Sequence, residues 1–161
     1  MSGPPQSAPP TFEPAFIAGI TAIFEERIPF NRLLGLRLDR IESDSITAHI
    51  EMRPELIGNY EHHRLHGGVI SATLDTVGGL AVLAGVAARH GNEPPEQQLM
   101  RFGRIGTVDL RVDYLRQGIG ARFEVRANVL RLGSRLASTR MEFLGEAGEL
   151  VAAGAGTYIV S

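Results

Sequence analysis

Three amino acids are missing from this chain of 161 residues, which contains no cysteine, no lysine and no tryptophan. The absence of cysteine excludes disulfide bonds, thiolate nucleophiles and cysteine-ligated metal sites, and it fits a reducing compartment, which we predict to be the cytoplasm. Because lysine is absent, all 16 fixed positive charges are arginine guanidinium groups. Guanidinium groups form paired hydrogen bonds with phosphates, so a cluster of arginines favours an anionic ligand.

The first ten residues, MSGPPQSAPP, have no basic start and no apolar run. A secretory signal peptide needs both features, so residues 1–13 are predicted instead to form a disordered, proline-rich tail. Residues 14–161 have the length of one domain. The chain is 43% hydrophobic and 21% charged, an ordinary globular composition. We therefore predict a single domain over residues 14–161.

The charges are distributed unevenly, although the net charge is only −2. Residues 101–140 contain nine arginines and three acids, a balance of +6, whereas residues 1–100 contain seven arginines and twelve acids, a balance of −5. The basic region lacks the interleaved aromatic residues typical of single-stranded nucleic-acid binding. It favours a small anionic ligand, and we predict no nucleic-acid partner.

The pattern of apolar residues predicts a helix, two strands, a long helix and four strands, in that order. Apolar residues recur at helical spacing over residues 14–27, and Pro29 ends this helix. Alternating apolar and polar residues predict strands at 34–41, 45–52, 107–116, 121–132, 136–144 and 150–160. The polar segment 54–65 is predicted to be irregular.

The segment from Gly67 to about Ala88 is apolar nearly all round, which describes a helix buried on most sides. A curved antiparallel sheet is the element available to surround it, so the predicted fold class is α+β. The segment is long enough to span a membrane. Asp75, the many small residues and the flanking arginines Arg64 and Arg89 argue against stable membrane insertion.

One carboxylate, Asp75, interrupts this apolar helix eight residues after Gly67. Glycines at the start of a helix expose unpaired N–H groups at the positive end of the helix dipole, which suits an anion or a developing oxyanion. An acid in apolar surroundings suits a general base or a nucleophile. The alternative is a packing role for the glycines, with Asp75 bonded to a neighbouring strand.

These two features cannot meet within one chain. Eight residues span about 12 Å along a helix axis, so Asp75 lies far from the start of its own helix. An antiparallel pair of helices in a two-fold dimer would place Asp75 of one subunit near Gly67 of the other. A shared site requires at least a homodimer, and we predict a homotetramer built from such dimers.

The motif His66-Gly67-Gly68, with Asp75 nine residues after the histidine at the head of the central helix, resembles the hotdog-fold acyl-CoA thioesterases. The likeness is strongest to the small bacterial branch related to the PaaI-type (phenylacetate-degradation) thioesterases. It extends over roughly residues 30–160 and includes IPFNRLLGL, ELIGN, LHGGVISATLD, IGTVDLRVDYLR and GAGTYIV. The resemblance implies a hotdog fold, with five to six antiparallel strands wrapped around one long helix.

The resemblance also implies hydrolysis of an acyl-CoA thioester without a cofactor. By position, the N–H of Gly67, or that of Gly68, polarises the thioester carbonyl, while Asp75 of the other subunit activates water or attacks directly. Thr107 falls where relatives carry a serine or threonine that orients the water. Asn59 resembles an assisting asparagine, but it precedes the histidine of the motif by seven residues where six are expected.

In this fold the nucleotide of CoA runs over the edge of the sheet and its loops. Arg116 matches a position on this nucleotide-binding rim. Further rim positions are matched in the next turn by Arg131, Gly133, Ser134 and Arg135. Their positive charge agrees with the charge balance of this region. The predicted partner is an acyl-CoA with a medium to long chain, and an aryl group stays open. Val77, Leu80 and Leu83 are predicted to line its pocket.

Two other functions stay open. In a hotdog hydratase or dehydratase, a histidine and an acid, here His66 and Asp75, would share proton transfer. A non-catalytic acyl-CoA binder could also use this fold, since fold does not dictate function. His62, His63 and His66 have the spacing of metal ligands on a helix face, but no further ligand is evident, and we predict no metal site.

Overall fold

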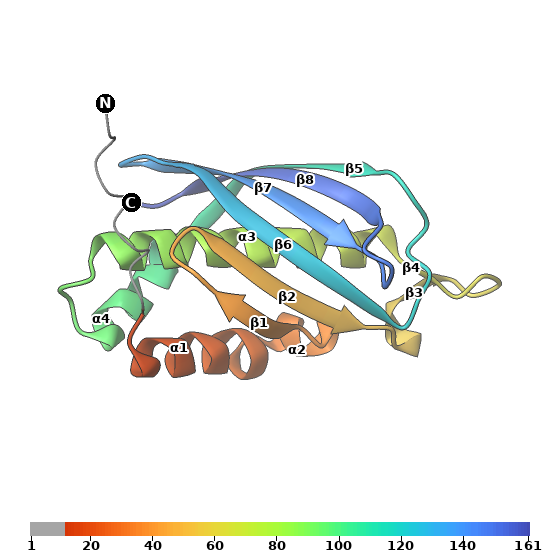
Figure 1. The fold of residues 1–161 in the computed structure, drawn as a ribbon, viewed down its shortest axis with the longest axis horizontal. Coiled ribbons are helices and arrows are strands. Elements are labelled where there is room, and N and C mark those ends of the chain that lie inside the picture. Colours follow the sequence, from red (N-terminus) through yellow and green to blue (C-terminus); the bar gives the residue numbers. More distant parts are fainter. Residues whose placement is uncertain (1–11) are drawn as a thin grey trace, which may run out of the picture.

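The structure is a computed structural model, and it describes residues 12–161. Six strands form one antiparallel sheet in the order β1-β2-β6-β7-β8-β5. This sheet curves around the long helix α3, Gly67–Arg89 (Figure 1). The predicted α+β architecture, a hotdog fold, is confirmed. Only residues 12 and 13 of the predicted tail, residues 1–13, lie within the described range, and there the ring of Phe12 stacks on Phe16 at 4.6 Å.

All six predicted strands form. Their bounds are Arg37–Ile41 for β1, Ser45–Glu51 for β2, Gly106–Tyr114 for β5, Arg122–Leu132 for β6, Leu136–Leu144 for β7 and Leu150–Ile159 for β8. Successive side chains of a strand point to opposite faces. On β2, for example, Ile46, Ala48 and Ile50 are buried against α3, whereas the residues between them face outward.

Most of the surface of α3 is covered by the sheet, as its apolar sequence predicts. The helix is long and apolar enough to cross a membrane, but 67% of that apolar window is buried inside the protein. Val77, Leu80 and Leu83 are fully enclosed in this subunit's own core. The prediction that they line the acyl pocket is therefore wrong, because the sheet occupies their side of the helix. The face left open carries small or polar residues: Gly68, Ser71, Ala72, Asp75 and Thr76.

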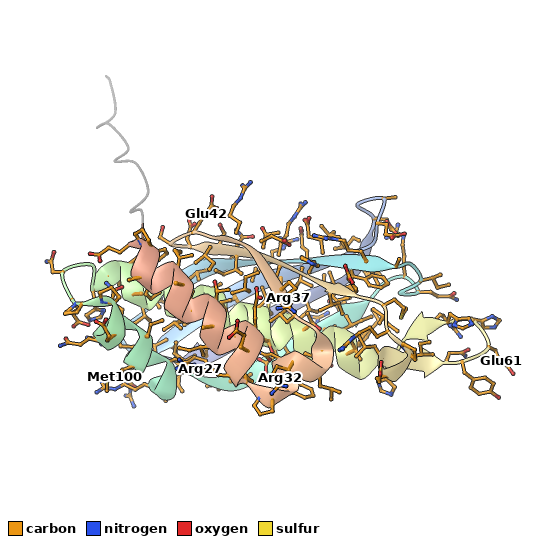
Figure 2. The ribbon with its side chains drawn as sticks, turned by 90° about the horizontal axis from the view of Figure 1, so that it is seen from below. Arg27, Arg32, Arg37, Glu42, Glu61 and Met100 are labelled. Carbon is orange, nitrogen blue, oxygen red and sulfur yellow. The ribbon has the colours of Figure 1, made fainter. Side chains whose placement is uncertain are left out.

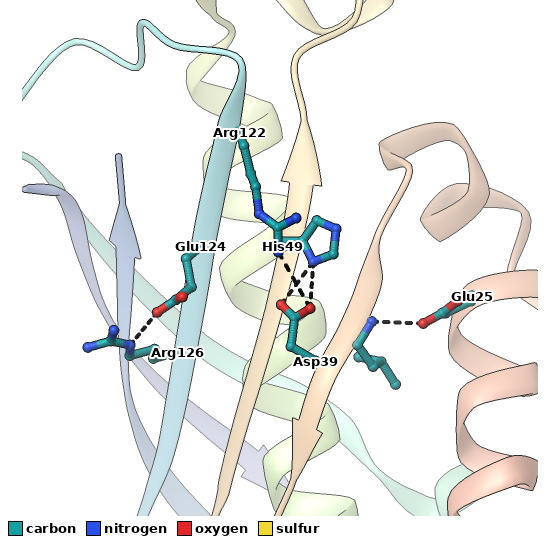
Figure 3. Close-up of polar contacts among 7 residues, drawn as sticks. Glu25, Asp39, His49, Arg122, Glu124 and Arg126 are labelled. Atoms are coloured by element: carbon teal, nitrogen blue, oxygen red, sulfur yellow. Dashed lines mark hydrogen bonds and ion pairs between the residues drawn. The ribbon is translucent and has the colours of Figure 1, made fainter. Parts of the chain in front are cut away.

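The N-terminal helix covers one edge of the sheet. It runs as α1, Pro14–Thr21, and continues as a π-helical turn, Ala22–Arg27. Pro29 ends it as predicted and also starts the short helix α2, Pro29–Leu34, because proline is favoured in the first turn of a helix. From the π-helical turn, the Glu25 side chain points toward β1 (Figure 3). Its carboxylate accepts hydrogen bonds from the Leu38 N–H of β1 (2.8 Å) and from Arg37 Nη1 (2.8 Å). The edge of β1 that does not pair with β2 is therefore covered by Glu25.

Besides α2, five short elements were not predicted. The segment 54–65 holds a 3-10 turn, Pro54–Leu56, and a small hairpin of β3, Ile57–Asn59, and β4, Arg64–Leu65. Its loop carries Glu61 away from the body of the molecule (Figure 2). After α3 come α4, Pro95–Met100, and a 3-10 turn, η3, Arg101–Arg104. These elements are too short to show a periodic pattern, and tertiary packing decides them.

The outward face of the sheet holds a network of charged side chains (Figure 3). Asp39 lies 2.8 Å from His49 Nδ1 and 3.6 Å from Arg122, and Arg126 contacts Glu124 at 2.5 Å. Elsewhere in the basic region, Arg101 pairs with Glu93 and Arg111 pairs with Asp113. Four of its nine arginines are thus ion-paired. The other five make no ion pair within residues 12–161: Arg104, Arg116, Arg131, Arg135 and Arg140.

Candidate active site

The start of α3 presents one free backbone N–H. His66 caps the helix, and its Nδ1 accepts a hydrogen bond from the Gly68 N–H at 2.8 Å. The Val69 N–H donates to the His66 carbonyl at 2.9 Å. The Gly67 N–H has no acceptor within the described residues. Of the two glycines predicted to bind an oxyanion, the structure therefore leaves only Gly67 available, because His66 engages Gly68.

A pocket of about 300 Å³ opens beside this N–H. Asn59, His66, Gly67, Tyr114 and Arg116 are among its lining residues. The Tyr114 hydroxyl donates to the Gly67 carbonyl at 2.9 Å and so anchors the first turn of the helix. The Asn59 side-chain oxygen is already used, since it accepts from a backbone N–H of the β3–β4 loop at 3.1 Å. Arg116 donates to the Leu150 carbonyl at 2.8 Å.

The other histidines of the motif region lie away from this pocket. His62 and His63 are exposed in the β3–β4 loop, where His63 has a positive φ of 47°. Within residues 12–161, no three histidine or acidic side chains gather in an arrangement that could hold a metal ion.

The Asp75 carboxylate is held through one of its two oxygens. Oδ1 accepts hydrogen bonds from the Thr107 hydroxyl (2.9 Å) and from the Tyr158 hydroxyl (3.2 Å). Tyr158 also lies 3.1 Å from the Asp75 backbone carbonyl. Oδ2 has no donor among the described residues. The carboxylate is therefore oriented by two strands, β5 and β8, while one oxygen remains available to a water molecule or substrate.

Tyr158 is a residue that sequence reasoning missed. Its side chain points to the core face of β8 and is only 1% exposed. A tyrosine buried on a strand usually contributes only to packing of the core. Burial and the neighbouring Asp75 raise the pKa of Tyr158 above its ordinary value. The hydroxyl thus stays protonated and remains a donor to Asp75. Gly78 makes room for it, because a Cβ at Gly78 would collide with the Tyr158 hydroxyl.

The raised pKa of Tyr158 predicts a loss of stability at high pH. Above about pH 10, the ordinary pKa of tyrosine, the unfolded chain releases this proton while the folded protein still holds it. Rising pH therefore favours the unfolded state. We expect the free energy of unfolding, measured by urea titration from about pH 8 to about pH 11, to fall less steeply for Tyr158→Phe than for the wild type. Equal slopes for the two proteins would contradict this.

A second pocket, of about 250 Å³, lies beside Asp75. Its polar lining includes Asn31, Thr76 and Thr107, and its apolar lining includes Phe24, Ile28, Phe30, Phe102 and Ile105. Asn31 is 2% exposed. Its Oδ1 lies 3.5 Å from the Thr76 hydroxyl, whereas its Nδ2 has no partner within the described residues. This pocket shares no lining residue with the one at Gly67.

The predicted CoA rim is divided between two places. Arg116 lines the pocket at the start of α3. Arg131, with the β6–β7 turn that contains Gly133, Ser134 and Arg135, lies at the other end of the helix. Arg89 of α3 donates to the Gly133 carbonyl there at 3.0 Å. Gly85, which lines the same surface as Arg131, follows Asp75 by ten residues, about 15 Å along the helix.

The family model of the thioesterase superfamily matches residues 62–152, more than half of the chain. This chain belongs to the thioesterase superfamily. The matched region holds the histidine-glycine motif, Asp75 and Thr107. Tyr158 and the pocket residues from the N-terminal helix lie outside it, so the family match alone would not indicate them.

Relatives within the superfamily resemble almost the whole chain. The medium/long-chain acyl-CoA thioesterase YigI of Escherichia coli strain K12 is 38% identical over 138 residues, covering 86% of this chain and 89% of YigI. The crystal structure of a thioesterase-superfamily protein from Shewanella oneidensis has a TM-score of 0.84 at 40% identity, covering 93% of this chain and all of that one. A crystal structure from Syntrophus aciditrophicus has a TM-score of 0.81 at 38% identity, covering 90% and 95%.

Proposed function

We propose that this protein hydrolyses the thioester of a medium- to long-chain acyl-CoA at a site shared between two subunits. The observation that carries the proposal is the Asp75 carboxylate, which is oriented by Thr107 and Tyr158 and has one oxygen free in a pocket with an apolar wall. The name and the 38% identity of the relative YigI support the substrate class.

A dimer is supported by the surfaces that one subunit leaves open. Within residues 12–161, β5 pairs with β8 along one edge only, and Val108 on β5 is 59% exposed. A nine-residue strand with an unpaired edge is a template for pairing with another chain. The opposite edge of the sheet is occupied by Glu25. The open face of α3 carries small residues, which allow a second helix to approach closely.

In this dimer, each Asp75 faces the start of the other subunit's α3. Asp75 takes a proton from water, and the resulting hydroxide attacks the thioester carbonyl carbon. The Gly67 N–H of the partner subunit stabilises the oxyanion that forms. The C–S bond then breaks, and the CoA thiolate leaves and takes up the proton. Direct attack by Asp75, through an anhydride that water then opens, uses the same groups.

The unpaired arginines supply the charge that the phosphates of CoA need. Arg116 lies beside the Gly67 pocket, so we propose that it contacts the CoA portion. Arg131, Gly133, Ser134 and Arg135 remain predicted nucleotide contacts, and the cytoplasmic location remains a prediction. Hydratase chemistry has less support, because His66 Nδ1 is engaged by the Gly68 N–H.

The first test is thiol release from a panel of acyl-CoAs with short, medium, long and aryl acyl groups. We expect turnover of medium and long chains by the wild type. Binding of acyl-CoA without release of thiol from any member of the panel would contradict hydrolysis and favour a binding protein on the same fold.

The shared site predicts that two inactive variants restore each other's activity. In a mixed dimer of Asp75→Ala and Gly67→Pro subunits, one of the two sites keeps both Asp75 and the Gly67 N–H. Random mixing after co-refolding should therefore restore about a quarter of wild-type activity, because about half of the dimers are mixed and each has one intact site. A site contained within one chain would give no restoration. The control is Asp75→Ala refolded by the same procedure without the Gly67→Pro subunit.

A further inference from the structure

The pocket beside Asp75 has a polar end and an apolar end. Asp75 and Thr107 are hydrogen-bonded at the polar end. Gly79 lines the pocket one helical turn further along α3, and Ile105 lines it two residues before Thr107 on the approach to β5. Ile105 directly follows η3 in the chain, and Gly79 lies toward the C-terminal half of α3. α1 and α4 lie beside that half of the helix (Figure 1). A thioester at Asp75 would therefore direct its acyl chain toward the apolar end.

Two aromatic rings meet among the apolar lining. Phe24 and Phe102 pack edge to face, with ring centroids 5.1 Å apart and an interplanar angle of 66°. Phe24 is 2% exposed in the core, and Phe102 is half-buried. The residue before Phe102, Arg101, is tied to Glu93 by two hydrogen bonds of 2.9 and 2.5 Å. The contact between the rings thus joins two segments far apart in sequence.

We propose that Phe24 and Phe102 form the end wall of the acyl pocket and set the chain length that is hydrolysed fastest, at about eight to ten carbons. The inference rests on the proposed thioesterase function. A methylene group fills about as much space as a water molecule, roughly 30 Å³, so a pocket of about 250 Å³ accommodates roughly eight such groups. Longer chains meet the two rings.

The test compares kcat/KM for saturated acyl-CoAs from four to sixteen carbons. The wild type should show its optimum at about eight to ten carbons. Phe102→Ala removes the ring from the wall and makes room for roughly three to four more methylenes. The ratio of kcat/KM for tetradecanoyl-CoA to that for octanoyl-CoA should rise at least about tenfold. Phe102→Trp enlarges the wall and should move the optimum to shorter chains.

Phe12→Ala is the matched control, because Phe12 is also a half-buried phenylalanine that packs against the core but does not line the pocket. It should keep the wild-type chain-length profile. If Phe102→Ala does not fold, Phe102→Trp still tests the wall. An unchanged optimum in both Phe102 variants, or a wild-type optimum at sixteen carbons, overturns the end-wall assignment and leaves hydrolysis standing. Absence of thiol release from every chain length overturns the thioesterase function itself.

Discussion

Asp75→Asn should lower kcat at least about 1,000-fold, a loss of about 4 kcal/mol in transition-state stabilisation. An amide keeps an oxygen that can accept from Thr107 and Tyr158, so the side chain stays in place. It cannot take a proton from water or attack a carbonyl, because the amide nitrogen has no available lone pair. The measurement is steady-state thiol release from a medium-chain acyl-CoA, with the melting temperature and acyl-CoA affinity measured in parallel.

Thr107→Val is the matched control for Asp75. It removes one of the two donors to Oδ1 and leaves the carboxylate intact, so a smaller loss of kcat, about tenfold, is expected from one hydrogen bond. If Asp75→Asn retains more than about a hundredth of wild-type kcat, a loss below about 2.7 kcal/mol, the carboxylate is not the central group. The packing interpretation of Asp75 would then be favoured.

Gly67→Pro should lower kcat about 100- to 1,000-fold, the usual effect of removing one oxyanion donor. Gly67 is the first residue of α3, the position at which proline is best tolerated in a helix. His66 before it has φ −66° and ψ 134°, which is the conformation preferred before proline. The substitution therefore deletes the free N–H and is compatible with the local backbone. Stopped-flow or steady-state thiol release measures the effect.

Gly67→Ala separates the N–H from the size of the side chain. An added Cβ would lie 3.4 Å from the Tyr114 ring, an ordinary contact, and the N–H is kept. We expect Gly67→Ala to retain most of the wild-type kcat. Equal losses in the alanine and proline variants would indicate that steric crowding, and not the missing N–H, is responsible, and would argue against Gly67 as the oxyanion donor.

The fold could be predicted from the sequence because its elements carry strong local patterns. The alternation in the six strands and the apolar run of α3 each extend over many residues, so the order of elements and the buried helix follow from periodicity alone. The separation of Asp75 from Gly67 was also predictable, since the rise of a helix fixes it whatever surrounds them. The dimer that would bring the two residues together stays a prediction. By contrast, α4 and the β3–β4 hairpin are too short for a periodic signal and depend on tertiary contacts.

The details of the candidate site were decided only by the tertiary structure. Tyr158 reaches Asp75 because β8 lies beside β5, a pairing of segments about fifty residues apart that local patterns do not encode. The aromatic wall likewise joins Phe24 and Phe102 across the fold. The sequence by itself therefore determined the order of the elements, the buried helix and the distance along it between Gly67 and Asp75. The tertiary structure determined which side chains orient Asp75 and which line the pocket, because those contacts arise from long-range packing.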